Sequence, residues 1–275
     1  MTANPGNASP VGASLGRLGA MLSRHYYLFR GSWTRVFDLM YWPLLQMVIW
    51  GFITVFLNQH SSWFAQAAGV LIGAVLLWDV LVRAQFGFTL SLLEEMWSRN
   101  LANLFVSPLR PFEFGISLMM LGVLRSLVGV IPAALLAIPL FHYSVFEMGL
   151  PLVAFWSMLI MLGWSIGLMI AALLFRFGLA AESYAWASIF ILQPVSGVWY
   201  PVEVLPVWLK PVAWALPTTH VFEGMRALVI GGAFRWDLLA SAFALNVVYL
   251  ALGFAAFLYA FARARQRGQL LQSSE

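Results

Sequence analysis

The chain has 275 residues, of which 62% are hydrophobic and 9% are charged, and its formal net charge is +4. Soluble domains average roughly 45 to 50% apolar and about 25% charged residues, so this composition excludes a water-soluble protein and predicts an all-α integral membrane domain. The basic residues flank apolar runs instead of forming a patch with exposed aromatic residues, which argues against nucleic acid and for membrane lipids as neighbours.

The N-terminal part of the chain is predicted to lie on the membrane surface. Residues 1–13 have no apolar core preceded by positive charge, so they read as a disordered tail and not as a signal peptide. Residues 14–35 are predicted to form an amphipathic helix in the interface plane, serving either as an anchor or as a lever on a cytosolic partner. Its apolar residues recur at steps of three and four: Leu15, Leu18, Leu22, Tyr26, Phe29 and Trp33.

Six stretches approach the roughly 20 apolar residues that a helix needs to cross a bilayer. They are 36–57, 64–87, 114–140, 150–175, 183–200 and 238–262, of which the fifth is the least regular, and a tail follows over 263–275. Short cytoplasmic loops are enriched in arginine and lysine. Most arginines outside the spans lie on one side, and the other side has only Lys210, Arg226 and Arg235. This distribution places both termini in the cytoplasm.

The connection between the second and third spans is predicted to be a surface helix followed by a rigid corner. The helix has Leu93, Trp97, Leu101 and Leu104 on one face. Glu95 and Arg99 have the spacing of an i,i+4 ion pair. Pro108 and Pro111 should end this helix near Val106 and start the next one. The corner is either a connector or an element on which a partner pushes.

A proline-rich segment between the fifth and sixth spans cannot be one long helix, because Pro201, Pro206, Pro211 and Pro217 interrupt it. Its aromatic residues are of the type that favours the boundary between hydrocarbon and water: Trp199, Tyr200, Trp208 and Trp214. We predict a re-entrant or interfacial segment on the outer side, acting either as an aromatic belt or as a gate on the exit path.

Asp79, Arg83 and Arg125 lie inside predicted spans, where charges are costly and usually paired or facing water. Asp79 and Arg83, one helical turn apart, could form an ion pair, line a substrate path or relay protons. Arg125 lies near the bilayer centre at a rise of about 1.5 Å per residue, and Asp79 is its nearest carboxylate in this prediction.

Two small-residue pairs are predicted to be helix-packing faces. Gly163, Ser165 and Gly167 also match the G-x-S-x-G pattern of serine hydrolases. That pattern needs a strand and a sharp turn, so the middle of an apolar span excludes it. Gly69 and Gly73 form the second pair.

Metal and nucleotide chemistry have no support in the sequence. The chain has no cysteine, and its four histidines, His25, His60, His142 and His220, lack metal-site spacing. His220 is expected to hydrogen-bond locally. A P-loop needs a lysine before serine or threonine, but the single lysine, Lys210, precedes Pro211.

Two motifs resemble those of permease subunits of ABC type-2 exporters. The stretch NLFVSPLRPFEF matches the family pattern V-S/T-P-L-R/S-P-x-E, although upstream Trp97 to Asn100 replace its usual small residues around Gly-Thr. The stretch GVWYPVEVLPVWLKPVAWALPTTHVFEGMRALVIGG matches a second family region. The resemblance covers nearly the whole chain and implies one transmembrane domain over 14–262.

The resemblance also implies partners and site residues. A separate ABC ATP-binding subunit, in two copies and with ATP and Mg bound, would couple to Glu94, Glu95, Arg99, Ser107, Pro108, Leu109, Arg110, Pro111 and Glu113. A second copy of the permease would complete the path in the bacterial inner membrane. Path or gate residues would be Asp79, Arg125, Trp199, Tyr200, Pro201, Pro206, Trp208, Pro217 and His220.

The expected function is export of an amphipathic or glycan-type substrate without catalysis in this chain. The alternatives are a proton-coupled secondary transporter using Asp79, for which no internal repeat is seen, and a membrane-embedded enzyme, for which no cluster of catalytic residues is seen.

Overall fold

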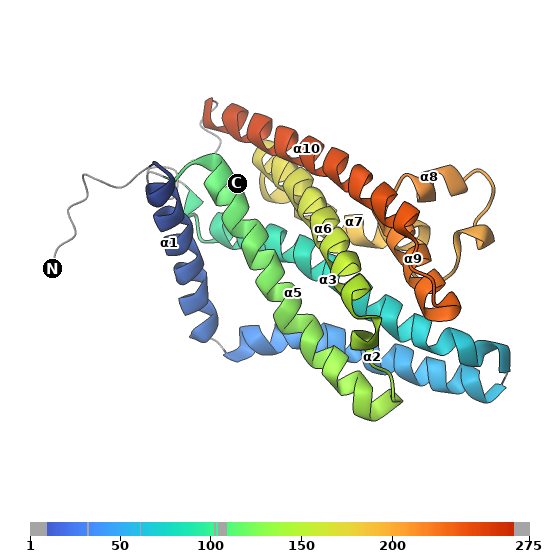
Figure 1. The fold of residues 1–275 in the computed structure, drawn as a ribbon. Helices are drawn as coiled ribbons and strands as arrows, with labels where there is room; N and C mark the ends of the chain where they lie inside the picture. The colour runs from blue at the N-terminus through green and yellow to red at the C-terminus, as the bar shows by residue number, and fades with distance from the viewer. Residues whose placement is uncertain (1–9, 32, 61, 102, 104–108, 267–275) are drawn as a thin grey trace.

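The computed structural model describes residues 10–266 except 32, 61, 102 and 104–108. The described residues form helices and no strand (Figure 1). The α-helices are α1 Pro10–Arg30, α2 Trp33–His60, α3 Ser62–Trp97, α5 Pro111–Phe141, α6 Leu150–Phe177, α7 Glu182–Leu192, α8 Lys210–Trp214, α9 Pro217–Gly231 and α10 Trp236–Gln266. Short 3₁₀ turns lie at Val145–Met148, Gly178–Ala181, Gln193–Val195 and Val202–Val204. The prediction of an all-α membrane domain is confirmed.

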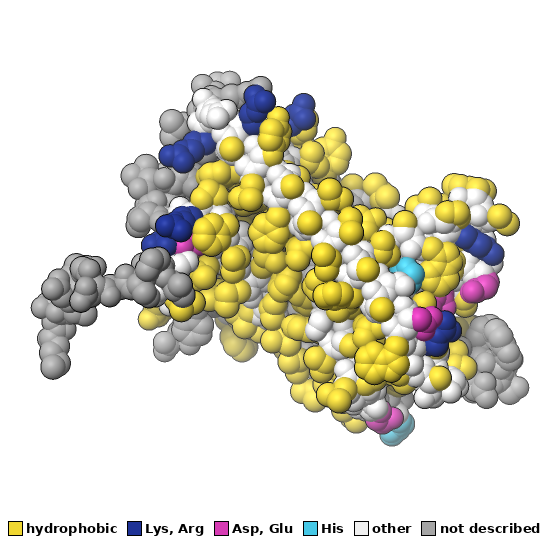
Figure 2. Space-filling model, turned by 45° about the horizontal axis from the view of Figure 1, so that its top comes forward, with side chains coloured by type: hydrophobic (Ala, Val, Ile, Leu, Met, Phe, Trp, Pro, Cys, Tyr) yellow, Lys and Arg dark blue, Asp and Glu magenta, His cyan; other side chains and the backbone are white. Residues whose placement is uncertain are grey.

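Five apolar stretches in the described part of the chain are long enough to cross a membrane. They are Val36–Leu57, Val70–Trp97, Pro111–Phe141, Leu150–Val195 and Trp236–Gln266. Figure 2 shows a broad hydrophobic band between two zones of charged side chains, as expected for a protein whose sides contact lipid. The molecule is therefore a multi-pass membrane protein.

The predicted fifth span, 183–200, is wrong as a single helix. α7 ends at Leu192 after 11 residues, which at about 1.5 Å per residue is only about 16 Å. A 3₁₀ turn with Pro194 follows, and Gly197 then has a φ of +68° that ends regular helix. Through these turns the chain passes from α7 into the segment that holds α8.

The predicted boundary between the second span and a separate surface helix is also wrong. α3 continues without a break to Trp97, because Leu92, Leu93 and Met96 extend its buried face. The helix ends where Arg99 adopts a left-handed φ of +53°. The predicted helix end near Val106 lies outside the described residues.

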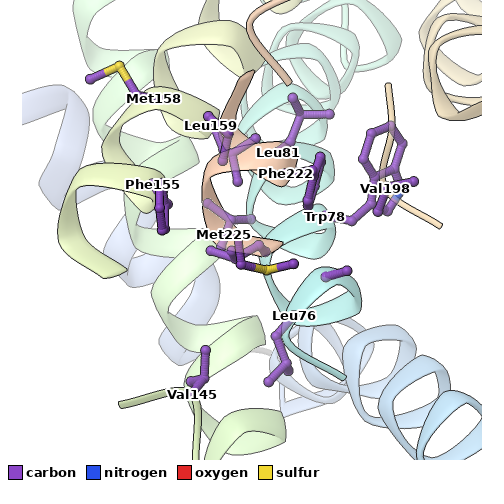
Figure 3. Close-up of a cluster of buried hydrophobic side chains, with 14 of the residues drawn as sticks. Leu76, Trp78, Leu81, Val145, Phe155, Met158, Leu159, Val198, Phe222 and Met225 are labelled. Atoms are coloured by element: carbon purple, nitrogen blue, oxygen red, sulfur yellow. The ribbon is translucent and has the colours of Figure 1, made fainter. Parts of the chain in front are cut away.

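α3 is the central helix of the bundle. Buried residues make up 83% of its apolar window, against 17% for α10. Large side chains from α3, α6 and α9 meet around it, including Trp78, Phe155 and Phe222 (Figure 3). The helices that pack against α3 therefore share one central packing partner.

Glycines allow two close helix crossings on α3. A Cβ at Gly163 would lie 2.6 Å from Ala84 Cβ and 2.9 Å from the Leu81 carbonyl oxygen, so the backbones of α6 and α3 touch there. Gly167 is equally close to Phe88, and Gly87 faces Gly122 of α5. The packing interpretation of the G-x-S-x-G stretch is confirmed.

α1 lies at the end of the bundle where α5 begins, and it turns steeply into α2 (Figure 1). It starts at Pro10 and ends at Arg30, so it begins earlier and ends earlier than the predicted 14–35. Met21 is buried against the bundle, whereas Leu15 is exposed. The remainder of the predicted tail lies outside the described residues.

Candidate functional site

A cavity of about 410 Å³ lies between α2, α3 and α7, with one side chain from α5. Its charged lining residues come from three helices: Asp38 from α2, Asp79, Arg83 and Glu94 from α3, and Arg125 from α5. The α3 residues share one face because they follow i+4 and i+11 steps along a helix. The structure thus brings together Asp79 and Arg125, which the sequence assigned to a path.

Aromatic side chains form much of the remaining wall. Trp42, Trp78, Phe86, Trp186, Phe190 and Trp199 all line the cavity. The rings of Phe86 and Trp186 lie 4.5 Å apart, which joins α3 to α7. Trp199 stacks on Trp50 with centroids 4.1 Å apart, which joins the outer segment to α2. Among the predicted gate residues of the outer segment, Trp199 faces this cavity.

The partner proposed for Arg125 from the sequence is wrong. Arg125 lies 3.6 Å from a carboxylate oxygen of Glu94, and no ion pair with Asp79 is found among the described residues. The arginine side chain reaches back along α3 past Gly87, whose absent side chain leaves room for it. The prediction placed the charge of Arg125 at the depth of its Cα in the span. It was wrong because a long side chain places its charge away from its own Cα.

Asp79 and Arg83 do not form the expected ion pair. Within the described residues no such contact joins them, and Asp79 Oδ2 and Arg83 Nε each lack a hydrogen-bond partner. Asp79 is only 5% exposed. Buried charges are normally paired or face a wet interior, so the cavity is where this carboxylate meets solvent or a ligand.

A second set of contacts fastens α1 to the start of α5 through Glu113. This carboxylate is fully buried. Arg17 donates to it through Nε at 2.8 Å and through a terminal nitrogen at 2.6 Å, and the Ser14 hydroxyl donates at 2.6 Å. The backbone N–H of Arg110 completes the set at 2.9 Å. The bidentate pair raises the pKa of Arg17 through its hydrogen bond to Glu113.

The end of α3 is fastened to α1 in the same way. Glu95 is buried and lies 2.6 Å from Arg24, and the Asn100 side chain donates to it at 2.8 Å. The predicted Glu95–Arg99 pair is therefore wrong, because Arg99 ends the helix and Arg24 takes its place. Sequence spacing along one helix could not reveal a partner 71 residues away.

The predicted coupling residues differ in their surroundings, and Arg99 is exposed at the turn that ends α3. Glu95 and Glu113 are buried in contacts with α1, and Glu94 faces the cavity. Leu109 packs on the core, Arg110 is exposed and Pro111 begins α5. Ser107 and Pro108 lie outside the described residues.

The outer segment is held by a buried ion pair that the sequence analysis missed. Arg226 of α9 contacts Glu223 at 2.8 Å and donates to the carbonyl oxygens of Gly197 and Val198. The same Glu223 oxygen accepts from the Val202 N–H at 2.9 Å. Burial raises the pKa of Glu223, and the Arg226 guanidinium opposes that rise. The sequence signal that could have predicted this ion pair is the i,i+3 spacing of Glu223 and Arg226.

The other predicted gate residues lie outside the cavity wall. Tyr200 donates its hydroxyl to the Pro194 carbonyl at 2.6 Å, and Trp208 is 75% exposed. His220 contacts the Trp214 carbonyl at 2.9 Å, which confirms its predicted local hydrogen bond. Pro201 and Pro206 shape the turns around Val202–Val204, and Pro217 begins α9.

Comparison with known proteins agrees with this architecture. A comparison with curated proteins finds no match. The family model for the ABC-2 type transporter matches residues 18–230, a range that contains the cavity, the Arg24–Glu95 contact and the outer ion pair. Because the match covers most of the chain, the protein belongs to the ABC-2 type transporter family.

Proposed function

We propose that the chain is the permease subunit of an ATP-driven exporter in the bacterial inner membrane. It carries an amphipathic or glycan-type substrate, and it works with two copies of a separate ATP-binding subunit and with a second copy of itself. ATP and Mg bind to the partner. The chain crosses the membrane six times, with both termini in the cytoplasm and α7 with its flanking turns as the fifth crossing.

The observation that supports this function most is the arrangement of neighbouring glutamates at the end of α3. Glu94 lines the cavity and contacts Arg125, whereas Glu95 contacts Arg24 of α1. Both residues lie within five positions of the turn at Arg99. Force applied to the connection after that turn would move the end of α3. The cavity wall and α1 would then move together, because Glu94 and Glu95 link both of them to this helix end.

The buried carboxylates assign α1 a mechanical role. Arg17 and Arg24 hold it to the ends of α5 and α3, so α1 moves with these two helices. Arg110 is exposed beside this attachment and is available to an external subunit. A push from a closing ATPase pair would therefore reach α3, α5 and α1 at once, and would open a path beneath the outer segment.

The test is transport in inside-out vesicles that contain the permease together with a separate ABC ATP-binding subunit. Replacing Arg110 or Pro108 with alanine should leave membrane insertion intact and should uncouple ATP hydrolysis from substrate accumulation. Arg263→Ala is a matched control, since this exposed arginine at the end of α10 lies outside the proposed coupling region.

Unchanged accumulation by both coupling variants would refute the coupling role. Accumulation driven by a proton gradient alone, with the purified permease and no ATP-binding subunit, would refute the proposed function in favour of a secondary transporter.

A further inference from the structure

The carboxylate of Asp79 is a buried acidic group in the wall of the cavity. Its side chain is in the middle of α3, it is 5% exposed, and its Oδ2 atom has no hydrogen-bond partner among the described residues. Removing a carboxylate from water without a partner is strongly unfavourable. A group kept in this state inside an apolar bundle indicates a ligand that supplies the missing interaction.

The charged residues that line the cavity indicate whether the ligand is a cation or an anion. Glu94 and Arg125 contact each other and neutralise one another at one end of the cavity. The remaining charged residues of the wall are Asp38, Asp79 and Arg83, two carboxylates and one guanidinium. These three residues have an excess of one negative charge, so the cavity attracts a cation more strongly than an anion.

The aromatic wall suits an organic cation better than a metal ion. Trp78 is adjacent to Asp79 on α3, and Trp42 and Trp186 line the cavity from α2 and α7. Indole faces attract cations within about 6 Å of the ring centroid and also bury apolar groups. A metal ion would need several oxygen or nitrogen ligands. The cavity volume of about 410 Å³ is that of a small-molecule site.

From these observations we propose that the cavity binds organic cations with an apolar or aromatic body, and that Asp79 is the counter-charge that determines this specificity. The inference rests on the proposed function and narrows its substrate class. Arg83, one turn away and also lining the cavity, opposes cation binding and sets the affinity. Removing each charge should therefore change cation affinity in opposite directions.

The experiment measures equilibrium binding to the purified permease in detergent, with no ATP-binding subunit present. The probes are tetraphenylphosphonium and tetraphenylborate, which have the same shape and opposite charge. The wild-type protein should prefer the phosphonium by about tenfold or more, since a desolvated charge pair discriminates by that order. Asp79→Asn should abolish the preference, Asp79→Glu should keep most of it, and Arg83→Gln should strengthen it.

Several results would overturn the proposal. Equal binding of the two probes by the wild type would show an apolar cavity without charge selection. An unaltered preference in Asp79→Asn would assign the selection to another group, and a weakened preference in Arg83→Gln would give that residue the opposite role. If Asp79→Asn fails to fold, the Asp79→Glu and Arg83→Gln measurements still decide.

The binding experiment and the transport experiment can fail separately. Charge-selective binding that depends on Asp79, in a permease that shows no ATP-driven uptake with its partner, would reject the exporter and keep the binding site. ATP-driven uptake without this charge selection would reject the binding site and keep the exporter.

Discussion

Replacing Arg226 with methionine tests whether the ion pair with Glu223 holds the outer segment in place. Methionine keeps an unbranched apolar stem and removes the guanidinium, so the carbonyl oxygens of Gly197 and Val198 lose their donor. The Glu223 carboxylate, 15% exposed, loses its counter-charge and keeps its bond from the Val202 N–H. The variant therefore isolates the charge and its hydrogen bonds.

The expected loss follows from the burial of both partners. Breaking a buried ion pair by removing one partner costs about 3 to 5 kcal/mol. Because Glu223 keeps its hydrogen bond from Val202, the loss should lie near the lower end of this range. We expect Arg226→Met to lower the free energy of unfolding by about 3 kcal/mol, which is roughly a hundredfold in the folding equilibrium. Glu223→Gln should cost less than Arg226→Met, because the amide oxygen still accepts from Val202 and Arg226 and the guanidinium still donates to the carbonyl oxygens of Gly197 and Val198.

The pH dependence gives a second readout with a definite sign. Burial raises the pKa of Glu223 above its unfolded value, and the Arg226 guanidinium limits the rise. In the Arg226→Met variant the rise is larger. A group whose folded pKa is raised adds stability at low pH and loses that contribution as pH increases through the folded pKa. The deficit of the variant should therefore be largest at neutral pH and should shrink on acidification.

The assay is reversible unfolding in mixed micelles between pH 5 and 8, for the wild type, both single variants and the double variant. In the Arg226→Met/Glu223→Gln protein the uncompensated charge is absent, so it should be at least about 1 kcal/mol more stable than Arg226→Met at neutral pH. A double variant no more stable than Arg226→Met, with a deficit independent of pH, would refute the electrostatic argument.

Further predictions concern helix packing, α1 and the cavity. Gly163→Ala should destabilise the protein by about 1 to 3 kcal/mol in the same unfolding assay, because its Cβ would meet the backbone of α3; Gly231→Ala, with open space around it, should change stability much less. Arg17→Ala should speed proteolysis of α1 and lower ATP-driven transport. The control Arg235→Ala removes an exposed pair and should do neither, so equal effects would contradict the attachment role. Arg125→Leu should reduce transport more than it shifts the melting temperature, and normal flux would make this arginine structural.

The membrane architecture and the family were predictable because they depend on local patterns. The first predicted span, 36–57, has the same bounds as the apolar stretch in α2. The Gly163–Gly167 face was also correctly predicted as packing, since small residues at i,i+4 spacing form such faces whatever the partner helix. Periodicity and composition determine which segments enter a bilayer.

Predictions that needed a partner distant in the sequence were wrong. Glu94 and Glu95 were assigned to a surface helix from its apolar face and to a coupling role from the family resemblance. The structure neutralises them with Arg125 and Arg24, and this allows α3 to continue to Trp97. The fifth span was predicted from hydropathy alone, which does not register that Pro194 ends a regular helix.

The sequence by itself determined that this chain is an α-helical membrane protein of the ABC-2 type, because apolar content, arginine distribution and motif order are properties of the linear chain. Only the tertiary structure decided which charges meet: it joined Arg17 to Glu113, gave Arg125 to Glu94 and left Asp79 facing the cavity without a hydrogen-bond partner at Oδ2. The physical reason is that the energy of a buried charge depends on its neighbours in space, and helix packing sets those neighbours.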